Sequence, residues 1–213
     1  MTLTKRWSRQ DDFDGEVATV AQRYRLEPAL IKAVVAAESS FNPLAHRAES
    51  PRPSLPPTPD FPEGGDASFG LMQVLARTAR ALGYKGTLDG LFHPATSLDL
   101  GARLLRDNMN RTSNNVADSI SAYNGGFRPS LGFGSPLPSG EYGNQVHVSR
   151  VLSHLDYFRA WERQKGGAGL TPATFPAGPV GHPWVDPGAG VVAPVRVTWW
   201  ERLWQWIRGR YAN

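Results

Sequence analysis

The residue best suited to chemistry in this sequence is Glu38, an acid on the apolar face of an expected helix. Residues 28–39 are expected to be helical, with a proline in the first turn. Ile31, Val34 and Val35 precede Glu38 at helical spacing and share its face. Burial among apolar side chains raises a carboxyl pKa, which suits a general acid near neutral pH. Taken alone, Glu38 could instead be an exposed glutamate at a helix end.

Three short segments form an ordered set of motifs, and Glu38 lies in the first of them. They read AESSFNPLA at 37–45, SFGLMQVLARTARALG at 68–83 and SAYNGG at 121–126. Each motif is common by itself, but the ordered set is specific. Together they closely resemble the catalytic domain of the soluble lytic transglycosylases, a family related in fold to goose-type lysozyme. The resemblance covers about residues 25–160.

The resemblance implies a mainly α, lysozyme-like fold and a peptidoglycan lytic transglycosylase that uses no cofactor. Such an enzyme cleaves the MurNAc–GlcNAc β-1,4 glycosidic bond without water. Glu38 matches the family's glutamate, which first protonates the leaving oxygen. The same glutamate then deprotonates the C6 hydroxyl of the N-acetylmuramic acid, and a 1,6-anhydro end is formed.

A hydrolytic mechanism is the alternative, because most glycosidases use two carboxylates. No second acid recurs in the matching segments. Glu63 and Asp66, in the loop before the second motif, are the nearest candidates. Their simpler interpretation is loop solubility. We therefore expect a single acid/base, with a peptidoglycan hydrolase (a muramidase or endolysin) as the alternative.

The resemblance also implies five substrate-binding residues. Ser39 follows the glutamate and is expected to hold its carboxylate or a sugar. Met72 and Gln73 would offer an apolar surface and an amide to an N-acetyl group, with core packing as the alternative for Met72. Tyr123 and Asn124 would contact sugar through a ring and an amide, with core packing again the alternative for Tyr123.

The chain departs from the family in the helix after the third motif. The family carries a Tyr-Val pair there, and its tyrosine approaches the glutamate. In this sequence His147 takes the place of that tyrosine, and Tyr142 lies five residues earlier as a possible substitute. A charged imidazole facing Glu38 would lower the glutamate pKa and make His147 a modulator of the pH optimum. A purely structural histidine is the alternative.

The expected elements are helices joined by loops rich in proline and glycine. Residues 44–66 and 126–140 are such loops, and no pair of strands is expected. Apolar spacing predicts helices at 28–39, 70–82, 97–110 and 141–163, and a short helix that ends within 121–126.

The chain is expected to divide into three parts. Residues 1–165 would form the catalytic domain, and the Gly/Pro-rich segment 166–196 would be a linker. Residues 197–213 show tryptophans at helical spacing and predict an amphipathic helix. That helix is too short to span a membrane, but it could dock on a virion protein, lie in a membrane interface or pack back on its own domain.

Composition narrows the function classes. The 213 residues include no cysteine, which excludes disulfides and thiolate zinc sites, and the five histidines lack metal-ligand spacing, so no metal is expected. The net charge of +4 favours anionic partners such as a cell wall. No basic cluster is interleaved with aromatic residues in the expected catalytic domain, and hence no nucleic acid is expected as a partner.

The expected site of action follows from the N-terminal sequence, which lacks the apolar stretch of a secretory signal. We expect a phage virion component that opens the host's periplasmic wall during genome entry. Release from the host cytoplasm through a holin is the alternative. The hypothesis from a different functional class is a virion protein that keeps the fold but has no catalytic activity.

Overall fold

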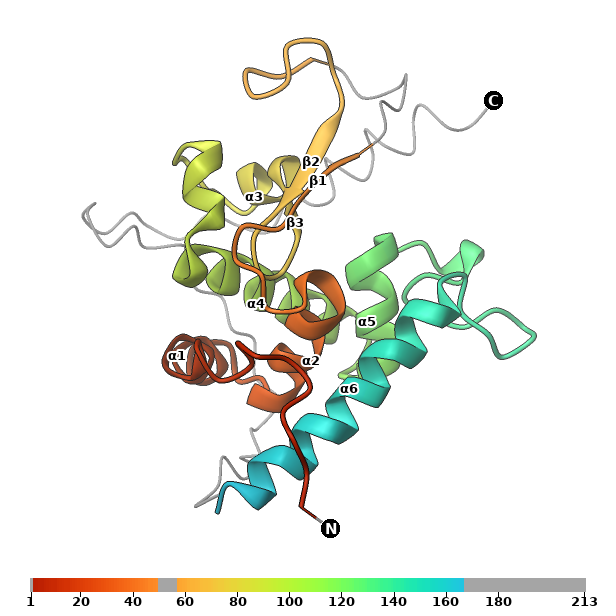
Figure 1. Cartoon of the computed structure of the whole chain (residues 1–213). Helices are drawn as coiled ribbons and strands as arrows, with labels where there is room; N and C mark the ends of the chain where they lie inside the picture. The colour runs from red at the N-terminus through yellow and green to blue at the C-terminus, as the bar shows by residue number, and fades with distance from the viewer. Residues whose placement is uncertain (1, 50–56, 167–213) are drawn as a thin grey trace. The chain divides into compact units, whose positions relative to one another are not determined.

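The described part of the chain is a mainly helical domain with one small sheet. The computed structural model describes residues 2–49 and 57–166. Its elements in chain order are α1 (Asp14–Tyr24), α2 (Pro28–Ser39), β1 (His46–Glu49), β2 (Asp66–Phe69), β3 (Val74–Leu75), α3 (Ala76–Ala81), η1 (Leu88–Phe92), α4 (Pro94–Arg111), α5 (Val116–Gly125), η2 (Pro129–Leu131) and α6 (Gln145–Gln164) (Figure 1).

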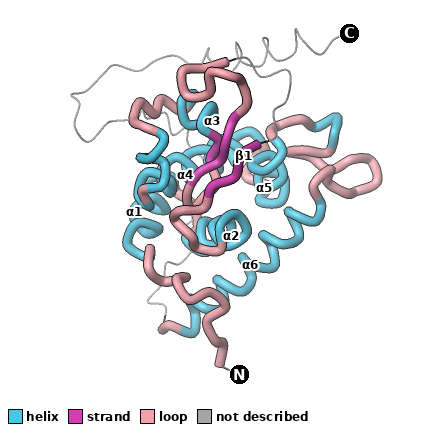
Figure 2. The backbone as a smooth tube through the Cα atoms, turned by 45° about the horizontal axis from the view of Figure 1, so that its top comes forward, coloured by secondary structure: helices cyan, strands magenta, loops and turns pink. Residues whose placement is uncertain are grey.

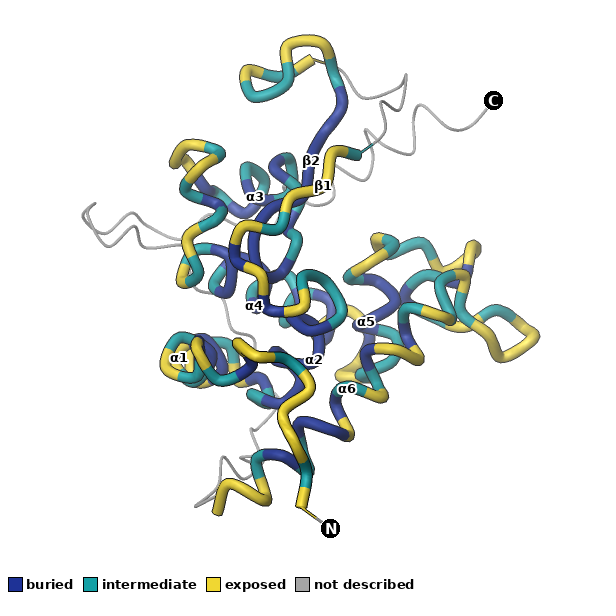
Figure 3. Tube along the Cα trace, viewed as in Figure 1, coloured by how far each residue is buried: buried dark blue, intermediate teal, exposed yellow. Residues whose placement is uncertain are grey.

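Helix α2 lies at the centre of this domain. It packs against α6 and α1, and α5 joins α6 to α4. Every residue from Ala29 to Ala36 is buried, so the helix is apolar on nearly all sides, as expected of a core helix (Figure 3). The helix ends where Ser40 and Phe41 adopt left-handed φ angles of 52° and 64°. This abrupt end leaves Glu38 in the last turn.

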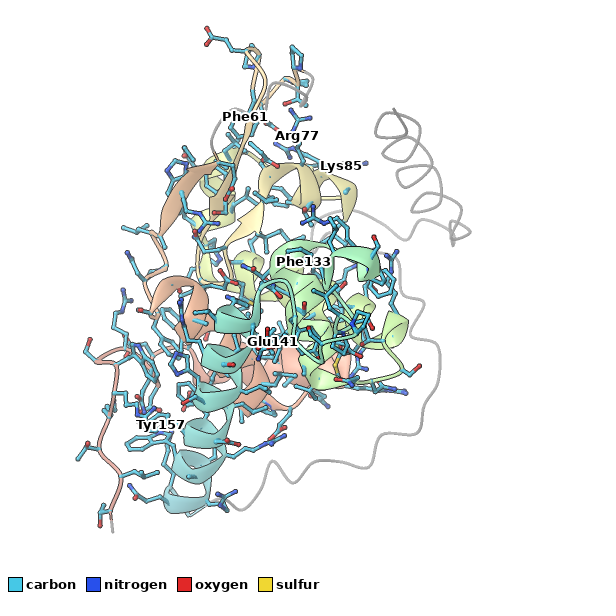
Figure 4. All side chains as sticks on the ribbon, turned by 90° about the vertical axis from the view of Figure 1, so that its right-hand side faces the viewer. Phe61, Arg77, Lys85, Phe133, Glu141 and Tyr157 are labelled. Carbon is cyan, nitrogen blue, oxygen red and sulfur yellow. The ribbon has the colours of Figure 1, made fainter. Side chains whose placement is uncertain are left out.

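The sheet begins shortly after α2 ends, and α3 follows it directly (Figures 1 and 2). Strands β1 and β2 are antiparallel, with His46 opposite Phe69 and Glu49 opposite Asp66. Strand β3 pairs with the end of β2. Figure 4 shows Phe61 and Arg77 at this end of the domain, far from Tyr157 on α6.

A buried lysine joins the N-terminal segment, α1, α2 and α6. The Lys32 side chain is 2% exposed, and its Nζ lies 2.6 Å from Asp14, 3.0 Å from Glu162 and 3.4 Å from Asp11. A cavity of about 70 Å³ borders this cluster and lies well along α2 from Glu38. The cluster therefore holds the helices together at the end opposite the glutamate.

Aromatic rings pack the N-terminal segment onto α6. The Trp7 ring stacks on Phe158 and meets the edges of His154 and Tyr157. Phe41, in the turn after α2, also contacts Trp7 and Phe158. The end of α2 is thereby fixed against α6.

Several sequence predictions are confirmed. Helix 28–39 is present with these bounds, 97–110 lies within α4, and 141–163 corresponds to α6. The short helix expected to end within 121–126 is α5. The linker 166–196 lies outside the described residues except at Gly166, and the terminal helix 197–213 lies outside them entirely.

Three predictions of local structure were wrong or missing. The expected absence of a strand pair is contradicted by β1 and β2, because β1 is polar and largely exposed and shows no apolar alternation. The expected helix 70–82 is helical only over Ala76–Ala81, since Gly70 and Gln73 adopt positive φ angles of 73° and 47°. Helix α1 was not predicted, although Val17, Val20 and Ala21 lie at helical spacing and are buried.

No helix among the described residues is long and apolar enough to cross a membrane. The same part of the chain contains no cluster of three acidic or histidine side chains that could hold a metal ion.

Candidate active site

Glu38 lies in the last turn of α2, with its side chain 13% exposed. Its carboxyl makes no hydrogen bond to any described residue. Burial raises the pKa of Glu38 to about 7, while the charges of Arg47 and Arg150 oppose that rise. The carboxyl group is therefore largely protonated below neutral pH, which is the state that a general acid requires.

The turn at 70–73 lies against the end of α2 and is fixed to it. The Ser39 hydroxyl donates to the Leu71 carbonyl at 2.7 Å. The Tyr123 hydroxyl on α5 donates to the Met72 carbonyl at 2.8 Å. Ser39 thus bonds the turn and not the Glu38 carboxylate, which differs from the role expected for it.

Tyr123 is close enough to Glu38 for their charges to interact. Burial, and secondarily the charge of Glu38, raises the pKa of Tyr123 well above its usual value. The phenol therefore stays protonated throughout the working pH range. Tyr123 supports the turn beside the glutamate through its hydroxyl, and contact of its ring with sugar stays a prediction.

Gln73 closes the turn through its side-chain amide. Its Nε2 donates to the carbonyls of Ala45 and Gly70 at 2.9 and 3.0 Å, and its Oε1 accepts from the Ser68 hydroxyl at 2.9 Å. The amide was expected to meet an N-acetyl group. In the structure its donors are both used within the protein, and it joins the turn to β1 and β2.

The Met72 side chain is fully buried, with 0% exposure. A Cβ atom on Gly101 of α4 would lie 2.4 Å from the Met72 sulfur, so the two elements pack without a gap. The side chain therefore packs in the core, which is the alternative that the sequence left open for Met72, and its contact with a sugar stays a prediction. Its backbone carbonyl accepts the hydrogen bond from Tyr123.

The Asn124 side chain is exposed at the end of α5. Its Oδ1 accepts from the Asn144 amide at 3.0 Å, which joins α5 to the start of α6. Because a carbonyl oxygen can accept two hydrogen bonds, Asn124 remains available to a sugar hydroxyl.

His147 of α6 faces Glu38, as the sequence comparison suggested. Its Nε2 lies 3.6 Å from Glu38 Oε1, and both side chains are 13% exposed. Burial, with a smaller effect from Arg150, lowers the pKa of His147 to about 4. The imidazole is therefore neutral near pH 6, and the expectation that its positive charge would lower the glutamate pKa is not met. Tyr142 does not take this place, because its hydroxyl donates to Asp118 at 2.6 Å.

The acids considered for a second carboxylate do not meet Glu38. Asp66 is buried and accepts hydrogen bonds from the backbone N–H groups of Ala67 and Arg77. Glu63 is exposed in the loop before β2. Neither is among the charges that shift the pKa of Glu38.

Sequence reasoning missed Glu49 and Arg47, which lie on β1. The Arg47 guanidinium donates to Glu49 Oε1 at 2.9 and 3.1 Å, and the charges of both residues act on Glu38. Their i,i+2 spacing, which puts them on one face of a strand, was the available signal. It went unused because 44–66 was expected to be a loop.

A mainly helical domain with a protonatable glutamate at the end of its central helix is typical of lysozyme-like glycan-cleaving domains. Residues 17–131, more than half of the chain, match the family model of the transglycosylase SLT domain. The chain belongs to the transglycosylase SLT domain family. The sequence prediction of a lytic-transglycosylase domain is thus confirmed at the level of the family.

Relatives and solved structures agree with this assignment. A transglycosylase of Enterobacteria phage PRD1 is 33% identical over 110 residues, which are 52% of this chain and 33% of that protein. The lytic transglycosylase Slt of Pseudomonas aeruginosa aligns with a TM-score of 0.51 at 18% identity, over 72% of this chain and 25% of that one.

The 70 kDa soluble lytic transglycosylase of Escherichia coli gives a TM-score of 0.50 at 19% identity, over 70% of this chain and 24% of that one. These likenesses confirm the expected lysozyme-like fold. The chain spans a third or less of each of these proteins.

Proposed function

We propose that this chain is a peptidoglycan lytic transglycosylase in which Glu38 is the acid and the base. The observation that carries the proposal is the burial of Glu38, which keeps its carboxyl protonated up to about pH 7 at the end of α2. Membership of the transglycosylase SLT domain family supports glycan strands as the substrate.

The proposed reaction needs one carboxyl group. Glu38 transfers its proton to the glycosidic oxygen while the bond from that oxygen to C1 of the muramic acid breaks. The resulting Glu38 carboxylate takes the proton of the C6 hydroxyl while the C6 oxygen forms a bond to C1. The acid is regenerated, no water is consumed, and the product carries a 1,6-anhydro end. Ser39, Gln73, Tyr123 and Asn124 would hold the turn and the sugar in place.

The test is mass spectrometry of the fragments released from purified peptidoglycan by the wild-type chain and by Glu38→Gln. Anhydro ends from the wild type are expected, with activity reduced about 100- to 10,000-fold in the variant, as for the loss of a general acid. Glu141→Gln is the matched control, because Glu141 is an exposed loop residue. It should release fragments at the wild-type rate.

Two outcomes would contradict the proposal. Reducing ends in place of anhydro ends would mean hydrolysis, and Glu49 would then be the second carboxylate to test, since its charge acts on Glu38. No release by the wild type, where a known wall-cleaving enzyme succeeds, would favour a structural protein that kept the fold.

We also propose a phage setting, in which the protein opens the host wall locally during genome entry. Similarity to a transglycosylase of phage PRD1 supports this setting. Residues 197–213, outside the described residues, would attach the enzyme to a virion protein or a membrane interface. Deletion of 197–213 should abolish that association and leave glycan cleavage unchanged. Unchanged association after the deletion would contradict this role.

A further inference from the structure

The imidazole of His147 leaves a buried nitrogen without a partner beside Glu38. Nε2 of His147 is inaccessible to solvent and makes no hydrogen bond to any described residue. Among the described acids, only Glu38 places an oxygen within 4 Å of it, with Oε1 at 3.6 Å. An unsatisfied buried polar group costs free energy, so this nitrogen and the facing oxygen have reason to approach.

The separation of 3.6 Å is slightly too long for a hydrogen bond. Contacts of this kind in unliganded sites shorten when a substrate closes them off from water. A movement of about 0.6 Å by either side chain would give the usual N–H···O distance. His147 stands on α6, which packs directly against α2, so a small adjustment between two helices suffices.

The surroundings of His147 determine how many protons its ring carries. Burial and the nearby Arg150 disfavour a second proton and lower its pKa to about 4. Glu38 faces the ring from α2, and Tyr123 on α5 and Arg47 on β1 are charged or titratable groups that interact with Glu38. Between about pH 4 and pH 7, the ring therefore carries one N–H and the carboxyl carries one proton.

We propose that His147 is a positioning residue whose Nε2–H donates to Oε1 of Glu38 and leaves the acidic proton on Oε2. This inference rests on the proposed function of Glu38. The opposite tautomer would accept the carboxyl proton at Nε2 and aim it away from the glycosidic oxygen. With Nε2–H as the donor, the proton stays on Oε2 and is free for transfer to the glycosidic oxygen.

The same contact acts after proton transfer. Once Oε2 has given its proton to the leaving oxygen, the carboxylate bears a negative charge. The bond from Nε2–H to Oε1 then becomes a charge-assisted hydrogen bond and is stronger than before. The imidazole keeps its own proton throughout, so the carboxylate remains the base for the C6 hydroxyl.

Variants of His147 test this role through kcat and its pH profile. His147→Phe removes the donor and should lower kcat about 10- to 100-fold, the effect of losing one hydrogen bond to a charged group. The alkaline limb of the profile should also move upward, because the Glu38 carboxylate loses a stabilising donor. His147→Gln keeps an N–H donor and should restore most of kcat.

His154→Gln is the matched control, because His154 lies two turns further along α6 and contacts Trp7. It should leave the pH profile unchanged. A purely structural role for His147 would lower thermal stability without moving the alkaline limb. The proposal would be overturned if His147→Phe kept the wild-type kcat and the alkaline limb of its pH profile did not move. It would also be overturned if the kcat of His147→Gln were no higher than that of His147→Phe.

A second measurement does not depend on activity. Nitrogen-15 NMR of the free, full-length protein near pH 6 reports which ring nitrogen of His147 carries the proton. We expect a proton on Nε2, and a proton on Nδ1 would overturn the inference. If the wild type releases no glycan, the proposed function fails, while the NMR result still decides the position of this proton.

Discussion

Glu38 keeps its proton because its carboxyl lies in the last turn of α2, where water is largely excluded. The backbone carbonyls at a helix C-terminus carry partial negative charge, and they too disfavour a carboxylate there. Arg47 and Arg150 oppose this effect but do not overcome it. A carboxyl group held protonated in this way can act as an acid, but its burial lowers the free energy of unfolding at neutral and alkaline pH.

Glu38→Gln should therefore stabilise the protein in a pH-dependent manner. The pKa of Glu38 is raised from 4.5 to about 7 by folding, so folding favours its protonated form. That contribution is complete below pH 4.5 and is lost as the pH rises through about 7. The neutral amide of the variant does not titrate. Between pH 4 and pH 8, we therefore expect the free energy of unfolding of the variant to gain about 3 kcal/mol relative to that of the wild type.

Chemical denaturation of both proteins at several pH values measures this difference. Glu141→Gln, an exposed substitution, should show a flat difference from the wild type over the same range. A Glu38→Gln variant whose advantage does not grow with pH would mean that the carboxyl is not held protonated by the fold.

At the scale of elements, the site depends on the fit between the turn at 70–73 and α4. Gly101 leaves space for Met72, since an added Cβ would lie 2.4 and 2.5 Å from the sulfur and Cβ of Met72. The Met72 N–H also donates to the Ser97 hydroxyl of α4 at 3.1 Å. A larger residue at position 101 would displace the turn that Ser39 and Tyr123 hold.

Gly101→Ala is expected to destabilise the protein by about 1–3 kcal/mol through overpacking, despite the better helix propensity of alanine. It should also reduce kcat, because the turn beside Glu38 shifts. Gly15→Ala in α1 is the matched control, since an added Cβ there meets nothing within 4 Å. The control should be neutral or slightly stabilising in thermal melts, and equal effects of the two substitutions would contradict the packing argument.

The sequence predicted the elements whose apolar spacing is regular. Helix α2 and the inward face of Glu38 followed from Ile31, Val34 and Val35, which are all buried. The turn at 70–73 was missed because its buried residues also fit a helical stripe, whereas the positive φ angles of Gly70 and Gln73 break the helix there.

Contacts between distant segments were harder to predict. The position of His147 opposite Glu38 could be inferred from the family motif, but its charge could not, because the charge depends on burial by the assembled helices. Glu49 was missed for a similar reason. Strand β1 becomes a strand through pairing with β2, and its own sequence shows no β pattern.

At the scale of the whole molecule, the cluster around Lys32 holds α1, α2 and α6 at the end opposite Glu38. The carboxylates of Asp11, Asp14 and Glu162 are 20%, 39% and 32% exposed, so water screens them in part. Burial alone would raise the pKa of Asp11, but hydrogen bonds chiefly from lysine and tryptophan side chains, together with the charge of Lys32, lower it to about 2.

Lys32→Met should lower the free energy of unfolding at pH 7 by about 2–4 kcal/mol, less than for a fully enclosed ion pair. Because the pKa of Asp11 is depressed by folding, its stabilising contribution is present above pH 3.8 and is lost as the pH falls through about 2. The charge of Lys32 is the smallest of the effects that lower the pKa of Asp11, so the difference between variant and wild type should shrink over that interval only by the part that this charge supplies. Denaturant titrations at pH 7, 4 and 2.5 would measure it.

Lys85→Met is the control, because Lys85 is exposed in a loop (Figure 4). It should change stability by less than about 0.5 kcal/mol at every pH. A similar loss for both lysines, or a loss for Lys32→Met that does not vary with pH, would contradict the electrostatic role of the cluster.

Under the proposed function, the hydrogen bonds that fix the turn beside Glu38 would also bear on the rate of the catalytic cycle. Ser39, Gln73 and Tyr123 are already bonded to this turn in the protein without substrate. The conformational entropy of ordering it is lost once, during folding, and not again at each encounter with a glycan strand. We therefore expect turnover to be limited by bond cleavage or by departure of the glycan, and not by closure of this turn.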